Sequence, residues 1–464
     1  MSPSTDERRM GALAVLCAMS LMIVLDSTIV AVAVPDIQRD LGFTEAGVSW
    51  VVNGYLVAFA GLLLLAGRLG DLVGAWRVFL AGLTLFTVAS LLCGFATTAG
   101  LLIAGRFVQG AGGALAAAVV IGMIVRLFPE PEAQARAMGI YSFTQAGGAA
   151  AGFVLGGLLT DALGWPVIFL INAPIGVAVW FFGRRLLPRE TGLGLGRGLD
   201  VPGALLITSG LSLGVYAIIQ ASIPAAAVAV LLIAGFLVRQ RLASHPLIPL
   251  RILSRRWLLT ASAAVVLVFA TGMGFQFMNA LFVQRVMGYD ALGTGLAFLP
   301  TPIVIGLVSL FAAPRLTGRF GPRPVLMAGL TLLVGGLLLL WRLPVEPSYA
   351  THMLPALIVM GLGVGVTVPS IIMLAMAGAA PADTGVVSGF INTAQQAGGA
   401  LGLSVLAALA ASRAGGSSVT ALHAGYTLAF LVAAGFVLTA LLITTFLLKT
   451  KDSVRHVEAS TALG

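Results

Sequence analysis

Runs of about twenty apolar residues recur along the whole chain, and short segments between them hold nearly all of its charge. Of the 464 residues, 59% are hydrophobic and only 9% are charged, whereas typical soluble proteins carry about 25% charged residues. Because so little charge cannot cover a water-facing surface, most of this surface must face lipid. A soluble array of buried helices is the alternative, and the low charge argues against it. We therefore expect an all-α polytopic membrane protein.

Charges, prolines and glycines divide the apolar sequence into fourteen predicted transmembrane helices. The predicted helices are 11–33, 48–66, 78–97, 101–124, 138–159, 166–187, 201–220, 224–239, 258–284, 294–313, 325–341, 353–376, 386–410 and 425–447. The eighth is the shortest. An even number of helices places both ends of the chain on the same side of the membrane.

The distribution of basic residues indicates which side that is, because Lys and Arg concentrate in cytoplasmic connections. With the N-terminus in the cytoplasm, 21 of the 26 basic residues fall inside and four fall outside, and Arg106 lies within a helix. We therefore predict cytoplasmic N- and C-termini in a cell (inner or plasma) membrane. The net charge of +9 does not indicate a nucleic-acid partner, since the arginines lie singly or in pairs between apolar runs.

Three short motifs recur in order about 250 residues further along the chain, which indicates two homologous halves. The pairs are Arg68-Leu69 with Arg315-Leu316, Gly110 and Gly112 with Gly361 and Gly363, and Gln145 to Ala149 with Gln396 to Ala400. We predict an N-terminal six-helix half over 1–190 and a linker with two extra helices over 191–257. A C-terminal six-helix half with a short cytoplasmic tail follows over 258–464, so the halves are parallel repeats.

Two charges lie at membrane depth, where a charge is costly and indicates function by default. Asp26 is the one acidic residue well inside a predicted helix, and Arg106 is the one basic residue there. The repeat partner of Arg106 is Leu357, so this charge belongs to one half only. Burial disfavours a charged carboxylate and a nearby cation favours it. Asp26 is therefore a candidate proton carrier with Arg106 as its partner; a static ion pair or a helix-capping role for Asp26 is the alternative.

Uncharged polar side chains within the predicted helices are candidates for lining a substrate cavity. They are Asn53, Tyr55, Gln109, Gln145, Gln276, Asn279, Asn392, Gln395 and Gln396. Hydrogen bonding between helices explains each of them equally well.

Two glycine-containing segments are candidates for conformational change. The predicted cytoplasmic loop after the second helix contains Gly67, Arg68, Asp71, Gly74 and Arg77. Its glycines permit a tight turn, and Asp71 is expected to cap the third helix or to pair with a cation. This loop is a candidate gate, with simple anchoring by positive charge as the alternative.

The fifth predicted helix carries Gly148, Gly152 and Gly156 at four-residue spacing, with Gly157 beside the last. This spacing places a smooth strip on one helical face, which allows close helix approach. The spacing fits two roles for this strip, namely sliding of a neighbouring helix along it or a static tight interface.

These segments resemble the major facilitator superfamily, and in particular its fourteen-helix drug:proton antiporter branch of multidrug and antibiotic-resistance exporters. Leu25 to Val30, followed by Ala33-Val34-Pro35, is similar to the first-helix motif of that branch. The segment Gly67 to Arg77 resembles the superfamily loop motif, and Arg106 to Gly110 resembles the fourth-helix motif linked to proton transfer. Gly148 to Gly157 resembles the antiporter motif of the fifth helix, with Phe153 where many members carry proline. The resemblance implies alternating access, export and exchange for protons.

We therefore expect a monomeric transporter that exports small apolar or amphipathic drugs in exchange for protons. It would need no cofactor, since no P-loop Gly-Lys-Ser/Thr motif is present and a proton gradient supplies the energy. A carrier of another solute with the same fold is the first alternative: an exporter of siderophores, peptides or amino acids, or an importer. A membrane enzyme is disfavoured because the four histidines are scattered without metal-ligand spacing. A sensor or scaffold would tolerate the loss of Asp26.

Overall fold

The structure is a computed structural model that describes residues 5–44, 46–189, 192, 194, 200–244, 246–247, 256–376, 384–414 and 418–447. The predicted cytoplasmic tail after 447 lies outside these residues, and so do parts of the predicted 191–257 linker, at 191, 193, 195–199, 245 and 248–255. Within the described part of the chain every regular element is a helix. Among the described residues, fourteen helices are long and apolar enough to span a membrane, and each overlaps one predicted helix, which confirms the predicted fold class.

The chain forms two compact units. Unit 1 comprises Met1–Leu247 with Tyr289–Leu296, and unit 2 comprises Ile248–Gly288 with Ala297–Gly464. The predicted division into six, two and six helices stays a prediction. The two extra helices belong to compact unit 1.

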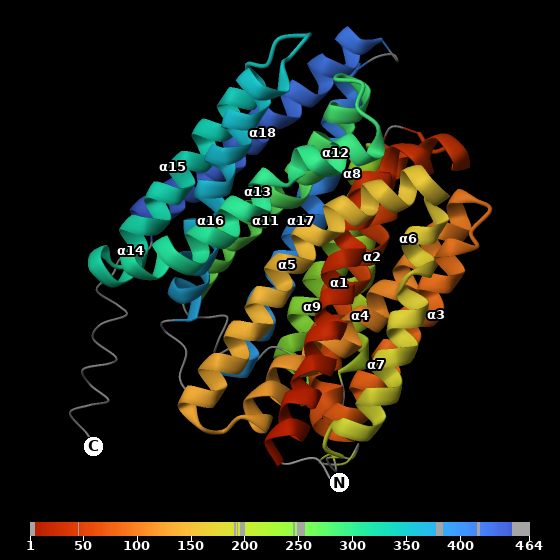
Figure 1. Cartoon of the computed structure of the whole chain (residues 1–464), viewed down its shortest axis with the longest axis vertical. Coiled ribbons are helices and arrows are strands. Elements are labelled where there is room, and N and C mark those ends of the chain that lie inside the picture. Colours follow the sequence, from red (N-terminus) through yellow and green to blue (C-terminus); the bar gives the residue numbers. More distant parts are fainter. Residues whose placement is uncertain are drawn as a thin grey trace. The chain divides into compact units, whose positions relative to one another are not determined.

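Among the described residues, helices α1 to α9 build most of unit 1 (Figure 1). They are α1 (Thr5–Leu41), α2 (Trp50–Val73), α3 (Ala75–Gly94), α4 (Ala99–Leu127), α5 (Pro131–Leu163), α6 (Pro166–Leu170), α7 (Asn172–Leu186), α8 (Val201–Ile219) and α9 (Ile223–Leu242). Helix α4 packs against α2 and α3, and α1 packs against α5 and α7. Helices α6 and α7 together make one span.

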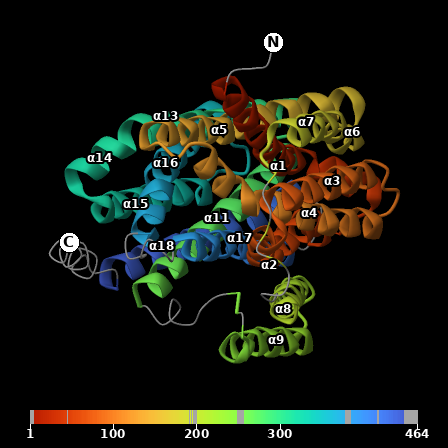
Figure 2. The ribbon, with the colours of Figure 1, turned by 90° about the horizontal axis from the view of Figure 1, so that it is seen from below.

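The two extra helices, α8 and α9, form a hairpin that packs against α2 (Figure 2). Asp200 holds the ends of this hairpin together. Its carboxylate caps α8 by accepting a hydrogen bond from the Gly203 backbone N–H at 3.0 Å. It also accepts from Arg239 Nε at 2.9 Å and from Gln240 Nε2 at 2.7 Å, both on α9. Outward-facing α9 side chains such as Leu231 are exposed, as expected of a helix that faces lipid.

The remaining described helices and two π-helical turns build unit 2, except that α12 lies mostly in unit 1. They are α11 (Arg256–Arg285), α12 (Ala291–Phe298), α13 (Pro300–Leu307), η3 (Val308–Ala312), α14 (Ala313–Phe320), α15 (Pro322–Trp341), η4 (Tyr349–Met353), α16 (Leu354–Met376), α17 (Thr384–Ala414) and α18 (Val419–Phe446). The first six residues of α12 cluster with unit 1. Helix α11 packs against α17 and α18, and α15 packs against α16 and α18. The π-helical turn η3 lies just before Pro314, whose missing N–H cannot continue the regular ladder.

The predicted loop after the second helix is wrong in its extent. Helix α2 continues through Arg68 and Asp71 to Val73, and α3 begins at Ala75, so Gly74 alone breaks the helix. Gly74 has φ 106°, a conformation that glycine adopts without steric cost. The expected capping by Asp71 is also wrong, because Gly74 is the N-cap of α3 and no side chain caps it. Gly74 therefore connects α2 to α3 by itself, without a longer loop.

Candidate functional site

Asp26 lies in the middle of α1, and its side chain is completely buried. The two hydroxyl residues that follow it bond within their own helix. Ser27 Oγ and Thr28 Oγ1 each donate to the Val24 carbonyl at 2.9 Å. These hydroxyls are therefore satisfied within α1. The partners of the Asp26 carboxylate lie on other helices.

Arg106 on α4 supplies the main partner. Its Nη1 lies 2.5 Å from Asp26 Oδ2, and its side chain is only 1% exposed. Nε of the same guanidinium donates to the Val51 carbonyl on α2 at 2.8 Å. The guanidinium carbon also lies 4.6 Å from the centre of the Tyr55 ring, which is within range of a cation–π interaction. Arg106 therefore joins α4 to both α1 and α2.

Gln109, one turn along α4, completes the environment of the ion pair. Its Oε1 accepts from Arg106 Nη1 at 2.7 Å, and its Nε2 donates to Asp26 Oδ1 at 2.7 Å. Both carboxylate oxygens of Asp26 therefore accept a close hydrogen bond. Arg106 and Gln109 therefore bind opposite oxygens of the same carboxylate and hold it between α1 and α4.

Two further residues in this network were not among the sequence candidates. Ser90 on α3 accepts from Gln109 Nε2 at 3.2 Å and from Asn172 Nδ2 at 2.9 Å, and it donates to the Phe169 carbonyl at 2.8 Å. Asn172 on α7 also points at Asp26 Oδ1, 3.5 Å away. Both are polar residues within apolar spans, which is the signal that identified the other candidates. The network thus draws on five spans of unit 1.

This arrangement makes the environment of Arg106 depend on the charge of Asp26. Removing two charges from water is costly, and the ion pair offsets that cost only while both partners stay charged. A proton on Asp26 would remove the attraction to Arg106. The guanidinium would keep the Val51 carbonyl, Gln109 Oε1 and the Tyr55 ring, so it has other partners in the same place. Loss of the Asp26 charge would weaken the contact of α1 with α4, whereas Arg106 would keep these partners on α2 and α4.

The glycine strip on α5 lies against the part of α1 that carries Asp26. Gly148 faces Leu21, Gly152 faces Thr28 and Gly156 faces the Ile29 backbone. A Cβ atom at Gly156 would lie 3.0 Å from Ile29 Cα, a tighter contact than most side chains make. Gly157 turns instead toward the start of α12, within unit 1. Three of the four predicted glycines therefore share one contact surface, and the fourth does not.

The other predicted residues of unit 1 are spread over α2, α3 and α5. Asn53 is buried on α2, and Gln145 on α5 donates to Tyr141 Oη at 3.1 Å. Among the predicted gate residues, Gly67 and Arg68 are partly buried in α2, and Asp71 and Arg77 are exposed. No ion pair to Asp71 is found among the described residues, so its predicted pairing stays a prediction.

The predicted cavity residues of unit 2 lie on α11 and α17. Gln276 and Gln396 are partly buried, and so are the secondary candidates Asn392 and Gln395. Asn279 is fully buried, and neither its Oδ1 nor its Nδ2 has a hydrogen-bond partner in the described part of the chain. Unsatisfied buried amides are rare and costly. Asn279 is therefore the predicted residue of unit 2 that most needs a partner from elsewhere.

The described residues contain no cluster of three or more His, Cys, Asp or Glu side chains that could hold a metal ion. The two cysteines, Cys17 and Cys93, are buried, and both are free.

The site residues lie on a chain with known relatives. It is 38% identical over 412 residues to the puromycin resistance protein of Streptomyces alboniger, covering 86% of this chain and 82% of that one. It is 36% identical over 447 residues to the cephamycin export protein of Amycolatopsis lactamdurans, covering 93% and 91%.

Solved structures show the same fold. A transporter of the POT family is similar with a TM-score of 0.73 at 15% identity, covering 96% of this chain and 98% of that one. A bacterial homologue of the lysosomal transporter Spinster gives a TM-score of 0.69 at 14% identity, covering 93% and 95%. A profile of the Major Facilitator Superfamily matches residues 16–403. This chain is a multi-pass membrane protein that belongs to the major facilitator superfamily of small-molecule transporters.

Proposed function

We propose that this protein exports small apolar or amphipathic antibiotics or drugs across the cell membrane and takes up protons in exchange. The proposed coupling of drug export to proton uptake rests on the buried network in which Asp26 contacts both Arg106 and Gln109. The relatives named for puromycin resistance and cephamycin export support the substrate class. The arginine bias supports cytoplasmic termini in the plasma membrane.

The proposed cycle alternates between two states of Asp26. In one state, ionised Asp26 holds α1 to α4 through Arg106, and the close contact of these two side chains supports this state. A proton from outside neutralises the carboxylate and frees α1 to move against α5, where Gly148, Gly152 and Gly156 allow close contact. Release of the proton to the cytoplasm restores the pair. No cofactor is required, and one polypeptide suffices.

A susceptibility panel tests this function. A sensitive bacterial host with and without the gene is exposed to antibiotics of several classes, with and without a protonophore. We expect at least one small amphipathic antibiotic to become less toxic when the gene is present, and the protonophore to remove that protection. If no compound is tolerated better, or if protection survives the protonophore, the proposed proton-driven export is wrong. Release of peptides, siderophores or amino acids in the same host would instead support the carrier of another solute.

A further inference from the structure

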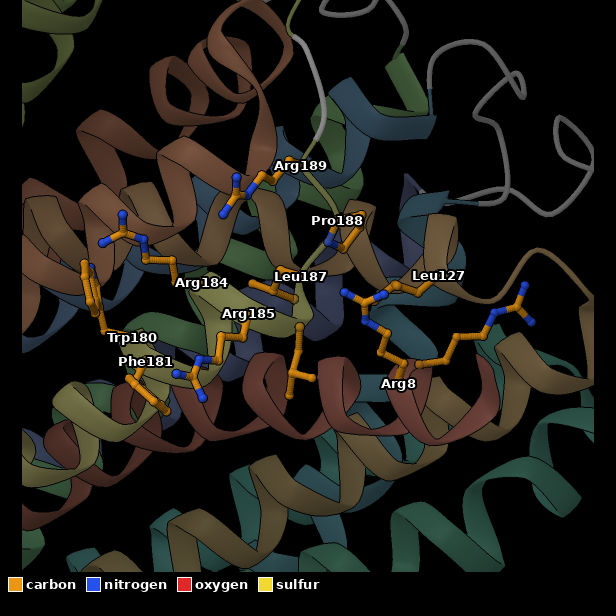
Figure 3. A pocket seen from close by; sticks show the side chains of 11 residues that line it. Arg8, Leu127, Trp180, Phe181, Arg184, Arg185, Leu187, Pro188 and Arg189 are labelled. Atoms are coloured by element: carbon orange, nitrogen blue, oxygen red, sulfur yellow. The ribbon is translucent and has the colours of Figure 1, made fainter. Parts of the chain in front are cut away.

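Five arginines surround a cavity of about 810 Å³ where the first turns of α1 meet the end of α7 (Figure 3). We call it the arginine pocket, and its basic residues are Arg8, Arg9, Arg184, Arg185 and Arg189. Its other lining residues are Leu127, Trp180, Phe181, Leu186, Leu187 and Pro188, and none of them is acidic. Figure 3 shows Arg8 on one side of the opening and Arg184 and Arg185 on the other.

The protein itself neutralises little of this charge. Arg9 lies 3.6 Å from the Glu130 carboxylate, in a contact that is exposed to solvent. Three of the other arginines lie over aromatic rings: Arg184 is 5.2 Å from Trp180, Arg185 is 4.0 Å from Phe181 and Arg189 is 5.3 Å from Trp76. Within the described residues these arginines and Arg8 form no ion pair. Their N–H groups remain available to an anion with several oxygens, which arginines bind in paired hydrogen bonds.

Apolar grooves lie on both sides of α7 and adjoin the arginine pocket. The α1–α7 groove, of about 610 Å³, is lined by residues such as Ala14, Ala18, Pro174 and Ala178, and it shares Leu186 with the pocket. The α3–α7 groove, of about 570 Å³, is lined by residues such as Leu80, Leu85 and Val88, and it shares Trp180 and Arg184 with the pocket. A cluster of cations thus lies between two apolar grooves.

We propose that the arginine pocket binds the phosphate of an anionic phospholipid, with one acyl chain in each groove. The arginines select the negative headgroup, and basic pockets between transmembrane helices are known to suit such groups. Trp180 lines the same pocket, and tryptophan is a residue type that favours the membrane interface. A soluble phosphate compound would use the arginines but would leave both grooves empty. This inference does not depend on the transported substrate.

The bound lipid would join two helices of the candidate functional site. Helix α1 carries Asp26, and α7 carries Asn172, which points at the Asp26 carboxylate. A headgroup that contacts Arg8 and Arg9 on α1 together with Arg184 and Arg185 on α7 bridges the ends of both helices. Anionic lipid is therefore expected to stabilise unit 1 against heat, whereas a neutral lipid is not.

Native mass spectrometry of the purified full-length protein in detergent tests the proposal. Phosphatidylglycerol, phosphatidylcholine and soluble glycerol 3-phosphate are titrated separately. We expect phosphatidylglycerol to bind at least tenfold more tightly than either of the others. Equal binding of the two lipids would refute the charge selection. Equal binding of glycerol 3-phosphate would show a soluble phosphate site instead of a lipid site. These comparisons use the unaltered protein, so they do not depend on the folding of any variant.

Variants locate the site. In Arg8→Gln/Arg9→Gln/Arg184→Gln/Arg185→Gln we expect phosphatidylglycerol affinity to fall at least tenfold. The matched control replaces four exposed arginines elsewhere with Gln: Arg136, Arg241, Arg315 and Arg319. Its affinity should stay within twofold of the unaltered protein.

Ala14→Phe/Ala178→Phe fills the α1–α7 groove, where both alanines are exposed. We expect this variant to weaken lipid binding with the arginines intact. Unchanged lipid binding in the arginine variant, or an equal loss in its control, would overturn the proposal.

Discussion

Arg106 Nη1 lies 2.5 Å from Asp26 Oδ2, and the two residues come from different helices in the interior of unit 1. Neither side chain has appreciable contact with solvent. A buried ion pair of this kind contributes little net stability, because the cost of removing both charges from water offsets most of the attraction. The pair matters because the loss of one charge leaves the other unpaired in the interior. The interaction between α1 and α4 at this point therefore depends on both charges.

Removing the cation alone should destabilise the protein strongly. Arg106→Leu leaves the Asp26 carboxylate buried with only Gln109 and Asn172 as hydrogen-bond donors. We expect the free energy of unfolding to fall by about 3–5 kcal/mol, the usual cost of an unpaired buried charge. Denaturation of the purified protein in detergent micelles measures it.

The double variant Asp26→Leu/Arg106→Leu is the control for this loss. Because both charges are removed together, we expect it to recover most of the lost free energy of unfolding. A double variant as unstable as Arg106→Leu would show that packing around Arg106, and not the unpaired charge, causes the loss.

Tyr55 should act through its ring and not through its hydroxyl. Its Oη has no hydrogen-bond partner in the described part of the chain, whereas its ring lies 4.6 Å from the Arg106 guanidinium. We expect Tyr55→Phe to keep transport near its original rate. Tyr55→Leu should slow transport and destabilise the protein by about 1–2 kcal/mol, because the cation–π contact is lost. Equal effects of both variants in transport and denaturation assays would contradict this role.

The glycine strip offers a matched pair of positions on α5. Gly156 faces the Ile29 backbone, whereas Gly147 has no neighbouring atom within 4 Å of an added Cβ. We expect Gly156→Val to push α1 away from α5 and to abolish transport, with a loss of about 1–3 kcal/mol from overpacking. Gly147→Val should keep transport within about twofold of the original rate, since a valine there meets no neighbour. Comparable transport by both variants would mean that close contact of α1 and α5 is not required.

Asn279 should behave as a residue kept for function at the expense of stability. Both of its side-chain amide atoms are buried without partners in the described part of the chain. Replacement by an apolar residue of similar size removes that desolvation cost, so Asn279→Leu should raise the free energy of unfolding by about 1 kcal/mol. We expect the same variant to slow transport, because substrate or another conformation supplies the missing partners. A less stable variant with unchanged transport would assign Asn279 a structural role instead.

The membrane fold and the central ion pair were within reach of sequence reasoning for a simple physical reason. Lipid penalises charge so heavily that helix spans and the two intramembrane charges, Asp26 and Arg106, stand out without any knowledge of packing. Helix ends were less predictable. The predicted first helix ends at residue 33, before Pro35, yet α1 continues to Leu41, because neighbouring helices and small local adjustments can satisfy the backbone group that a proline frees in a transmembrane helix.

Contacts between distant segments were out of reach. Ser90 and Asn172 are two among many small polar residues, and their meeting with Gln109 depends on how α3, α4 and α7 cross. The spacing of Gly148, Gly152 and Gly156 predicted a smooth face but could not identify α1 as its partner. The arginine pocket could not be predicted for the same reason, since Arg8 and Arg184 are far apart in sequence.

Transport by reconstituted protein tests the central claim most directly. The unaltered protein and Asp26→Asn are placed in liposomes with equal incorporation, and a proton gradient is imposed across the membrane. An antibiotic from the susceptibility panel serves as substrate. We predict that the gradient drives the unaltered protein to accumulate the drug and that Asp26→Asn, with the same shape but no titratable proton, accumulates none. Gradient-driven accumulation by Asp26→Asn at the original rate would contradict the assignment of Asp26 as the proton carrier.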